Sequence, residues 1–180
     1  VTRMIEKIKL ALILLIIATA HSNALIEVDI TRGNLDPLPI AVSPLSAEKE
    51  TEDNLIKELK QENIGQKISE VVENNLKNSG LFNPLNKDAF LQKPDIAHLK
   101  PRFEDWSLIK AQALITGKVT LVNEKLRVEF RLWDVLAGKE MMALAFTTVP
   151  SNWRRVGHII TDKVYERLTG EKGYFDTRII

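Results

Sequence analysis

The sequence predicts an α+β domain of two layers, in which two main amphipathic helices pack on one mixed, mostly antiparallel sheet. Two observations lead to this fold class. Three strand-like runs follow one another between residues 113 and 149 with only short turns between them, which favours antiparallel neighbours. Apolar residues recur at helical spacing in residues 64–79 and again in residues 153–168.

Composition narrows the class of function. The 180 residues are 44% hydrophobic and 27% charged, as expected for one globular domain with a core. The net charge of +1 does not favour a nucleic-acid partner, because proteins that bind phosphate backbones carry basic patches. Since the chain has no cysteine and its three histidines lie far apart, the sequence predicts neither a metal site nor a cofactor.

Residues 1–24 have the order of a secretory signal peptide. A basic start precedes an uncharged apolar run over residues 10–20, and Ser22 and Ala24 supply the small residues before a cleavage position. The apolar run is shorter than the roughly 20 residues that a membrane span needs, and an uncleaved anchor or a buried helix is the alternative. Cleavage after Ala24 predicts a periplasmic chain with no membrane span.

The first predicted strand covers residues 25–33, here called the N-terminal segment. Apolar and polar residues alternate along it, so it has a single apolar face, and a hinge rich in Gly, Asn, Asp and Pro follows. A terminal strand that docks on a sheet edge is also able to leave and pair with another protein, with an ordinary edge strand as the alternative. Its apolar face consists of Ile26, Val28 and Ile30, and its polar face of Glu27, Asp29 and Thr31.

The next elements are a strand and a helix. A short apolar run over residues 38–45, bounded by prolines, suits a buried strand. The highly charged residues 46–63 are predicted to form a loop or one or two helical turns. Residues 64–79 form a helix that Asn63 caps and Gly80 ends. The buried stripe of this helix consists of Ile64, Ile68, Val71, Val72 and Leu76.

Shorter elements connect this helix to the meander. Residues 81–90 are predicted to be extended, residues 94–101 to be a connector, and residues 103–110 to be a short helix. The strands of the meander then cover residues 113–122, 125–135 and 139–149, with turns at Asn123-Glu124 and at Gly138.

The last predicted helix covers residues 153–168, with Ser151 as its cap and Gly170 at its end. Alternation after this helix predicts that residues 173–180 begin a strand near Phe175. The inner stripe of the helix consists of Trp153, Val156, Ile160, Val164 and Leu168.

No catalytic constellation is visible in the sequence, which therefore predicts a protein that is not an enzyme. The conspicuous triplet at residues 153–155 is interpreted as an inward tryptophan followed by two solvated arginines. His158 is interpreted as a half-buried helix residue with a local hydrogen bond, since a lone histidine carries little catalytic information. Trp133 and Asp134 are interpreted as core and turn residues.

Five blocks of sequence resemble the amino-terminal domain of the TolB family of the Tol–Pal envelope system. They occur in the family's order and spacing and cover most of the chain after the signal, whereas the charged residues 48–62 depart from the family's pattern. The blocks are IEVDITRGNLDPLPIAV, ISEVVENNLKNSGLFNPL, FEDWSLIKAQALITGKV, FRLWDVLAGKEM and NWRRVGHIITDKVYERLTGEKGYFDTRI.

The resemblance implies an α/β domain over residues 34–172. In the family a six-bladed β-propeller follows it, so residues 173–180 are expected to lead into a propeller that this chain lacks. The family's site for the lipoprotein Pal lies on that propeller, and no Pal-binding residue is expected here. In the family the N-terminal segment binds the C-terminal domain of the inner-membrane protein TolA when it is released. The partner-binding residues implied here are Leu25, Ile26, Glu27, Val28, Asp29, Ile30, Thr31, Arg32 and Gly33.

The resemblance therefore implies a non-enzymatic periplasmic adaptor that links TolA to Pal and supports outer-membrane invagination in cell division and envelope integrity. The alternative is a truncated, stand-alone periplasmic scaffold or ligand-binding domain without Tol–Pal activity.

Overall fold

The central sheet of the domain is mixed. The computed structural model describes residues 26, 28 and 36–177. Three pairings in the sheet are parallel and short, whereas the two long pairings are antiparallel, as predicted. The strand order is β3 (Phe82–Pro84), β1 (Leu38–Val42), β4 (Ala113–Val122), β5 (Lys125–Asp134) and β6 (Lys139–Thr148), and β2 (Ser46–Ala47) also pairs with β4.

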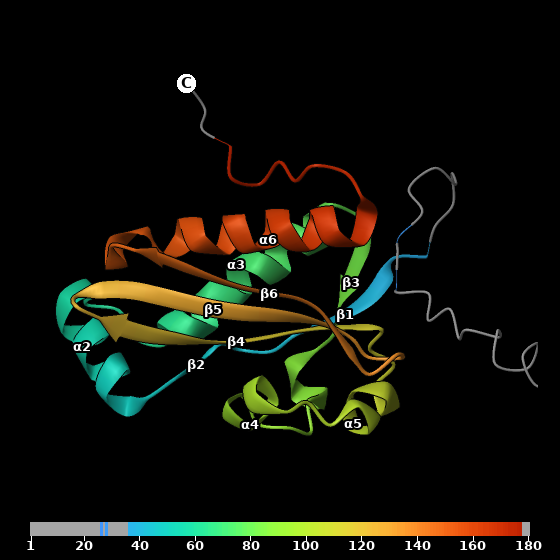
Figure 1. The fold of residues 1–180 in the computed structure, drawn as a ribbon, viewed down its shortest axis with the longest axis horizontal. Coiled ribbons are helices and arrows are strands. Elements are labelled where there is room, and N and C mark those ends of the chain that lie inside the picture. The colour runs from blue at the N-terminus through green and yellow to red at the C-terminus, as the bar shows by residue number, and fades with distance from the viewer. Residues whose placement is uncertain (1–25, 27, 29–35, 178–180) are drawn as a thin grey trace, which may run out of the picture.

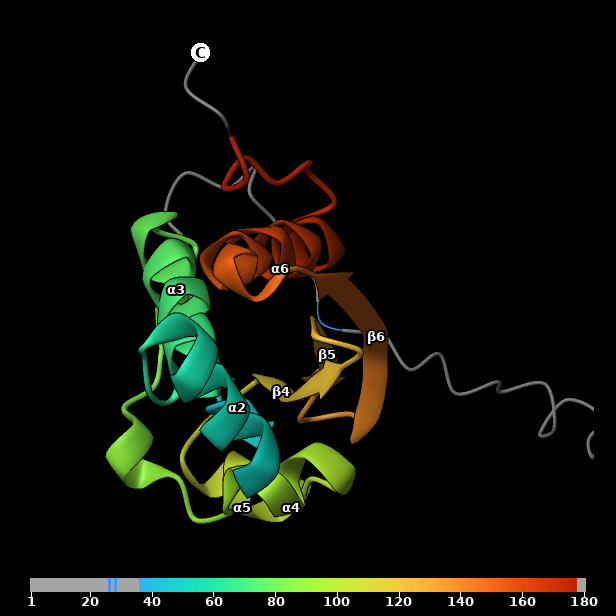
Figure 2. The ribbon, with the colours of Figure 1, turned by 90° about the vertical axis from the view of Figure 1, so that its left-hand side faces the viewer.

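Two helices cover one face of this sheet, as the predicted architecture requires. The helices α3 (Ile64–Asn78) and α6 (Trp153–Thr169) lie side by side over the sheet (Figure 1). Seen from the side, the sheet curves beneath them (Figure 2). Every apolar residue that was predicted for the two inner stripes is buried in the main hydrophobic cluster. This confirms both helices and the two-layer fold class.

The helices α3 and α6 approach each other closely at Gly157. A Cβ atom built at this position would lie 2.7 Å from Cγ1 of Val71 and 3.3 Å from the carbonyl oxygen of Ile68. The missing side chain therefore allows the backbone of α6 to contact α3 directly.

Two further helices cover one end of the opposite face. The helices α4 (Pro94–Leu99) and α5 (Phe103–Leu108) enclose a second, smaller apolar cluster around Trp106, which is 1% exposed. The short helix over 103–110 is thereby confirmed. The prediction of a connector over 94–101 is wrong, because Pro94 occupies the first turn of a helix, where its missing N–H has no intrahelical partner to lose.

The charged residues 46–63 form more regular structure than predicted. They contain β2 and the helix α2 (Lys49–Leu59), whose only two buried residues are Leu55 and Thr51. The predicted strand over 38–45 ends at Val42, because the backbone N–H of Leu45 bonds to Ser69 Oγ of α3 instead of to a strand.

The ends of several elements follow glycine and asparagine positions as expected. Gly80 and Gly170 have positive φ after α3 and α6, and Asn123 and Glu124 form the tight turn between β4 and β5. Two predicted caps are wrong: Asn63 precedes α3 without a side-chain cap bond, and Ser151 lies in a 3₁₀ turn (Pro150–Asn152) before α6. None of the helices in the described part of the chain is long and apolar enough to cross a membrane.

Candidate functional site

The structure describes two of the nine predicted partner-binding residues, Ile26 and Val28. Both are partly buried and pack against the main hydrophobic cluster. The remaining seven lie outside the described residues, so partner binding by this segment stays a prediction. They are Leu25, Glu27, Asp29, Ile30, Thr31, Arg32 and Gly33.

Val28 contacts the carboxyl end of α6. Its backbone N–H donates to the carbonyl oxygen of Leu168 at 2.6 Å. The last four carbonyls of a helix have no intrahelical partner, and here the neighbouring ones of Tyr165 and Glu166 accept from Thr169 Oγ1 and from the N–H of Gly170. Docking of Val28 therefore satisfies one of the acceptors that the end of α6 leaves open.

Ile26 contacts a buried carboxylate at the end of β5. Its backbone N–H donates to Asp134 Oδ2 at 3.1 Å, while Asp134 Oδ1 accepts from the N–H of Ala137 at 2.8 Å. Asp134 is 1% exposed. Hydrogen bonds to an ionised acceptor are stronger than those between neutral groups, so this contact fixes the position of Ile26 against the sheet.

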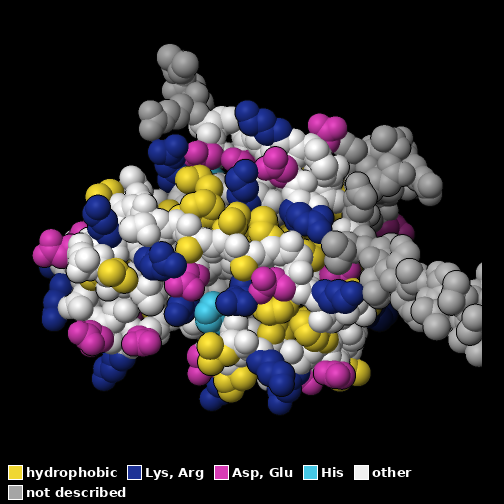
Figure 3. Space-filling view, in the orientation of Figure 1, with side chains coloured by type: hydrophobic (Ala, Val, Ile, Leu, Met, Phe, Trp, Pro, Cys, Tyr) yellow, Lys and Arg dark blue, Asp and Glu magenta, His cyan; other side chains and the backbone are white. Residues whose placement is uncertain are grey.

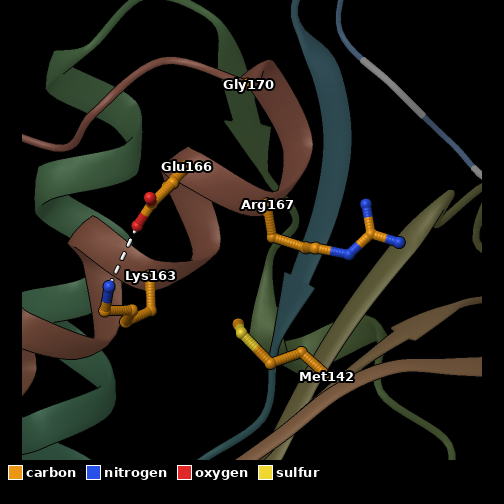
Figure 4. Close-up of a pocket in the computed structure, with 5 residues that line it drawn as sticks. All are labelled: Met142, Lys163, Glu166, Arg167 and Gly170. Atoms are coloured by element: carbon orange, nitrogen blue, oxygen red, sulfur yellow. Dashed lines mark hydrogen bonds and ion pairs between the residues drawn. The ribbon is translucent and has the colours of Figure 1, made fainter.

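A hollow of about 440 Å³ opens beside the end of α6 (Figure 4). Met142 of β6 lies on one side of it, and Lys163, Glu166 and Arg167 of α6 lie on the other. Lys163 pairs with Glu166 at 3.0 Å, and Arg167 Nε lies 3.4 Å from the carbonyl oxygen of Met141. The hollow is thus lined by charged and apolar side chains next to the position where Val28 docks.

Residues 173–177 do not form the predicted strand. The N–H groups of Phe175 and Asp176 donate to the two carboxylate oxygens of Asp162 at 2.7 and 3.1 Å, which holds the chain against α6. Arg155 adds a two-pronged ion pair to Asp176. Side-chain contacts to α6 therefore replace strand pairing in this exit segment (residues 173–177). Burial, and to a smaller extent the nearby Tyr174, raise the pKa of Tyr165 beneath it.

The residues singled out as possible chemistry have structural roles. Trp153 is 6% exposed, with Arg154 stacked over its ring at 4.6 Å. His158 is half-buried, and its Nδ1 lies 2.9 Å from Asn75 Nδ2 of α3. Trp133 donates from Nε1 to Thr116 Oγ1. Within residues 36–177, no group of three or more His, Asp or Glu side chains is arranged to hold a metal ion.

The surface charges are mixed. On the face shown in Figure 3, lysines and arginines alternate with acidic side chains rather than gathering into one basic patch. This agrees with the net charge of +1.

Sequence reasoning missed the two acceptors of the N-terminal segment. Asp134 was interpreted as a turn residue, which it also is, and Leu168 contributes a backbone oxygen that no side-chain pattern reveals. An aspartate at the buried end of a strand was the available signal, because a charge there needs hydrogen-bond donors.

Comparisons with known proteins agree with the fold and with the quoted blocks. A family model described as the TolB amino-terminal domain matches residues 26–141. The chain is 79% identical over 168 residues to the Tol-Pal system protein TolB of Pelagibacter ubique (strain HTCC1062), which covers 93% of this chain and 38% of that protein. The chain thus spans little more than a third of this relative's length.

Solved structures are similar in fold. The crystal structure of TolB from Acinetobacter baumannii superposes with a TM-score of 0.60 at 20% identity, over 83% of this chain and 33% of that one. The LpoB C-terminal domain from Salmonella enterica has a TM-score of 0.46 at 12% identity, over 65% of this chain and 86% of that one. From the family model and the 79% identity, the chain belongs to the TolB family of Tol–Pal system proteins.

Proposed function

We propose that this chain is a non-enzymatic adaptor of the periplasm, whose N-terminal segment leaves its docked position to bind the C-terminal domain of TolA. In this role it supports outer-membrane invagination at division and envelope integrity. Contact with Pal is expected only through a propeller that lies outside this chain. Residues 1–24 act as a cleaved signal, and the mature chain binds neither cofactor nor nucleic acid.

The observation that supports this proposal is the small number of contacts that hold Ile26 and Val28. Each makes one backbone hydrogen bond and is only partly buried. Such a bond contributes about 0.5–3 kcal/mol and half-burial of each side chain about 1 kcal/mol. Ordering the backbone costs about 1–2 kcal/mol per residue. The docked and released states therefore differ little in free energy, as a segment that changes partners requires.

The alternation of the segment suits strand addition to a partner. An extended peptide that joins a sheet edge gains main-chain hydrogen bonds and places alternate side chains in pockets. The apolar face with Ile26 and Val28 packs against this domain in the docked state. The same face would become available to TolA on release, so docking and partner binding exclude each other.

Calorimetric titration with the C-terminal domain of TolA tests the proposal. The chain from Leu25 is expected to bind, and Val28→Asp to weaken binding at least about tenfold, because a carboxylate would enter an apolar strand contact. Val122→Asp is the matched control, since Val122 is 47% exposed at the far end of the β4–β5 pair. Failure of every variant to bind while folded would instead favour a stand-alone scaffold.

A further inference from the structure

The Asp134 carboxylate holds two separate parts of the chain. Oδ1 accepts from Ala137 in the turn between β5 and β6, and Oδ2 accepts from Ile26, 108 residues earlier in the sequence. Asp134 ends β5 and pairs with Ala113 of β4 and Lys139 of β6, so its backbone is fixed by the sheet. At 1% exposure, both oxygens depend on protein donors.

We propose that Asp134 is the positioning residue that latches the N-terminal segment in its docked state. The inference rests on the proposed function, since it names the side chain that controls release of the segment. Leu168 supplies the second bond, but it does so at a helix end with a backbone oxygen. The side chain that decides between docking and release is therefore Asp134.

The chemistry of a carboxylate explains why aspartate fits this position. A carboxylate is an acceptor on both oxygens, so it receives the N–H groups of Ile26 and Ala137 together. An asparagine has one acceptor oxygen, and its NH₂ group would face the second N–H. Asp134→Asn keeps the size of the side chain while it loses one of the two bonds.

Asp162 provides a matched control on the same domain. It also accepts two backbone N–H groups, from Phe175 and Asp176, but it holds the exit segment instead of the N-terminal segment. Asp162→Asn removes the same kind of bond at a place that Ile26 and Val28 do not contact.

Amide exchange of Val28, followed by NMR on the chain from Leu25, measures docking without any partner. Every contact described here lies between residues 26 and 177, so this chain retains them all. Asp134→Asn is expected to accelerate exchange of the Val28 N–H by about ten- to hundredfold, the effect of losing one bond to a charged acceptor. Asp162→Asn is expected to leave it unchanged. Equal exchange in the unmodified chain and in Asp134→Asn overturns the latch.

Ile26→Pro tests the same bond from the other side. Proline has no backbone N–H, so this change removes the donor and leaves Asp134 in place. The double variant Ile26→Pro/Asp134→Asn is expected to exchange Val28 no faster than the faster single variant, because both changes remove one shared bond. Multiplied effects in the double variant would show that Asp134 acts without Ile26 and would overturn the proposal. This holds even if one single variant folds poorly.

Titration of Asp134→Asn with the C-terminal domain of TolA separates the latch from the proposed function. Release raises the population that is able to bind, so affinity is expected to rise, by at most the factor seen in exchange. Faster exchange without binding by any variant contradicts the proposed function and keeps the latch. Binding by the unmodified chain that Asp134→Asn neither strengthens nor accelerates in exchange contradicts the latch alone.

Discussion

His98 of α4 is a buried histidine in a positive environment. It is 6% exposed, and its Nδ1 has no hydrogen-bond partner among the described residues. Burial lowers the pKa of His98, the cations Lys118 and Arg131 lower it further, and Glu129 opposes them in part. The folded protein thus keeps this imidazole neutral at a pH where the unfolded chain, with a pKa of about 6.5, is partly protonated.

The sign of the resulting pH dependence follows from proton binding. Between the lowered pKa of folded His98 and about 6.5, the unfolded chain binds more protons, so the free energy of unfolding falls as the pH decreases. His98→Gln is expected to remove this contribution. Urea unfolding from pH 7.5 to pH 5 checks it: the variant should lose less stability than the unmodified protein, and parallel curves would contradict the assignment.

Single buried residues such as His98 were beyond sequence reasoning for a physical reason. Its burial depends on α4 packing against β4, and the proline at the start of α4 made residues 94–101 look like a connector. Where a helical stripe contained the residue, the interpretation was correct: His158 is half-buried and bonded to Asn75.

Among the elements, predictability follows the number of buried positions. The helices α3 and α6 each bury at least five apolar residues at helical spacing, which the sequence displays directly. The helix α2 buries only Leu55 and Thr51, so its charged residues hide the short apolar face. The alternation after Gly173 indicated a strand, but Asp162 of α6 binds those N–H groups first.

The contact between α3 and α6 gives a prediction for Gly157→Ala. The new methyl group would overlap Val71, whose Cγ1 and Cβ lie 2.7 and 2.8 Å from its position. Overpacking is expected to lower the free energy of unfolding by about 1–3 kcal/mol, more than the gain of about 0.5–1 kcal/mol in helix propensity. Chemical denaturation measures the change.

Val71→Ala supplies the control for this packing contact. It removes the overlapping Cγ1 atom, so the double variant Gly157→Ala/Val71→Ala should lose less stability than the sum of the two single variants. Strict additivity would show that Val71 is not the source of the strain.

At the scale of the whole molecule, the domain is expected to fold without its N-terminal segment. The main cluster contains 24 buried residues from α2, α3, α6 and the sheet, and Ile26 and Val28 only border it. Truncation to a chain from Asn34 should therefore change the free energy of unfolding by less than about 2 kcal/mol, because lost contacts and regained chain entropy nearly cancel. Unfolding of the truncated chain would show that the segment belongs to the core.

The docking position also shows how far sequence reasoning reaches for the whole molecule. The apolar face of the segment was predicted, and Ile26 and Val28 do pack against the domain. Their acceptors Asp134 and Leu168 lie more than 100 residues away in sequence, so only the assembled sheet and α6 bring them together.

The two docking bonds have a mechanical consequence. A pull on the beginning of the segment loads the bond at Ile26 and then the bond at Val28, so they break one at a time. The ten residue pairs that join β4 to β5 share a load between them instead. Tension therefore peels off the segment at forces that leave the domain folded, and the chain converts a weak pull at its beginning into an exposed, unpaired strand.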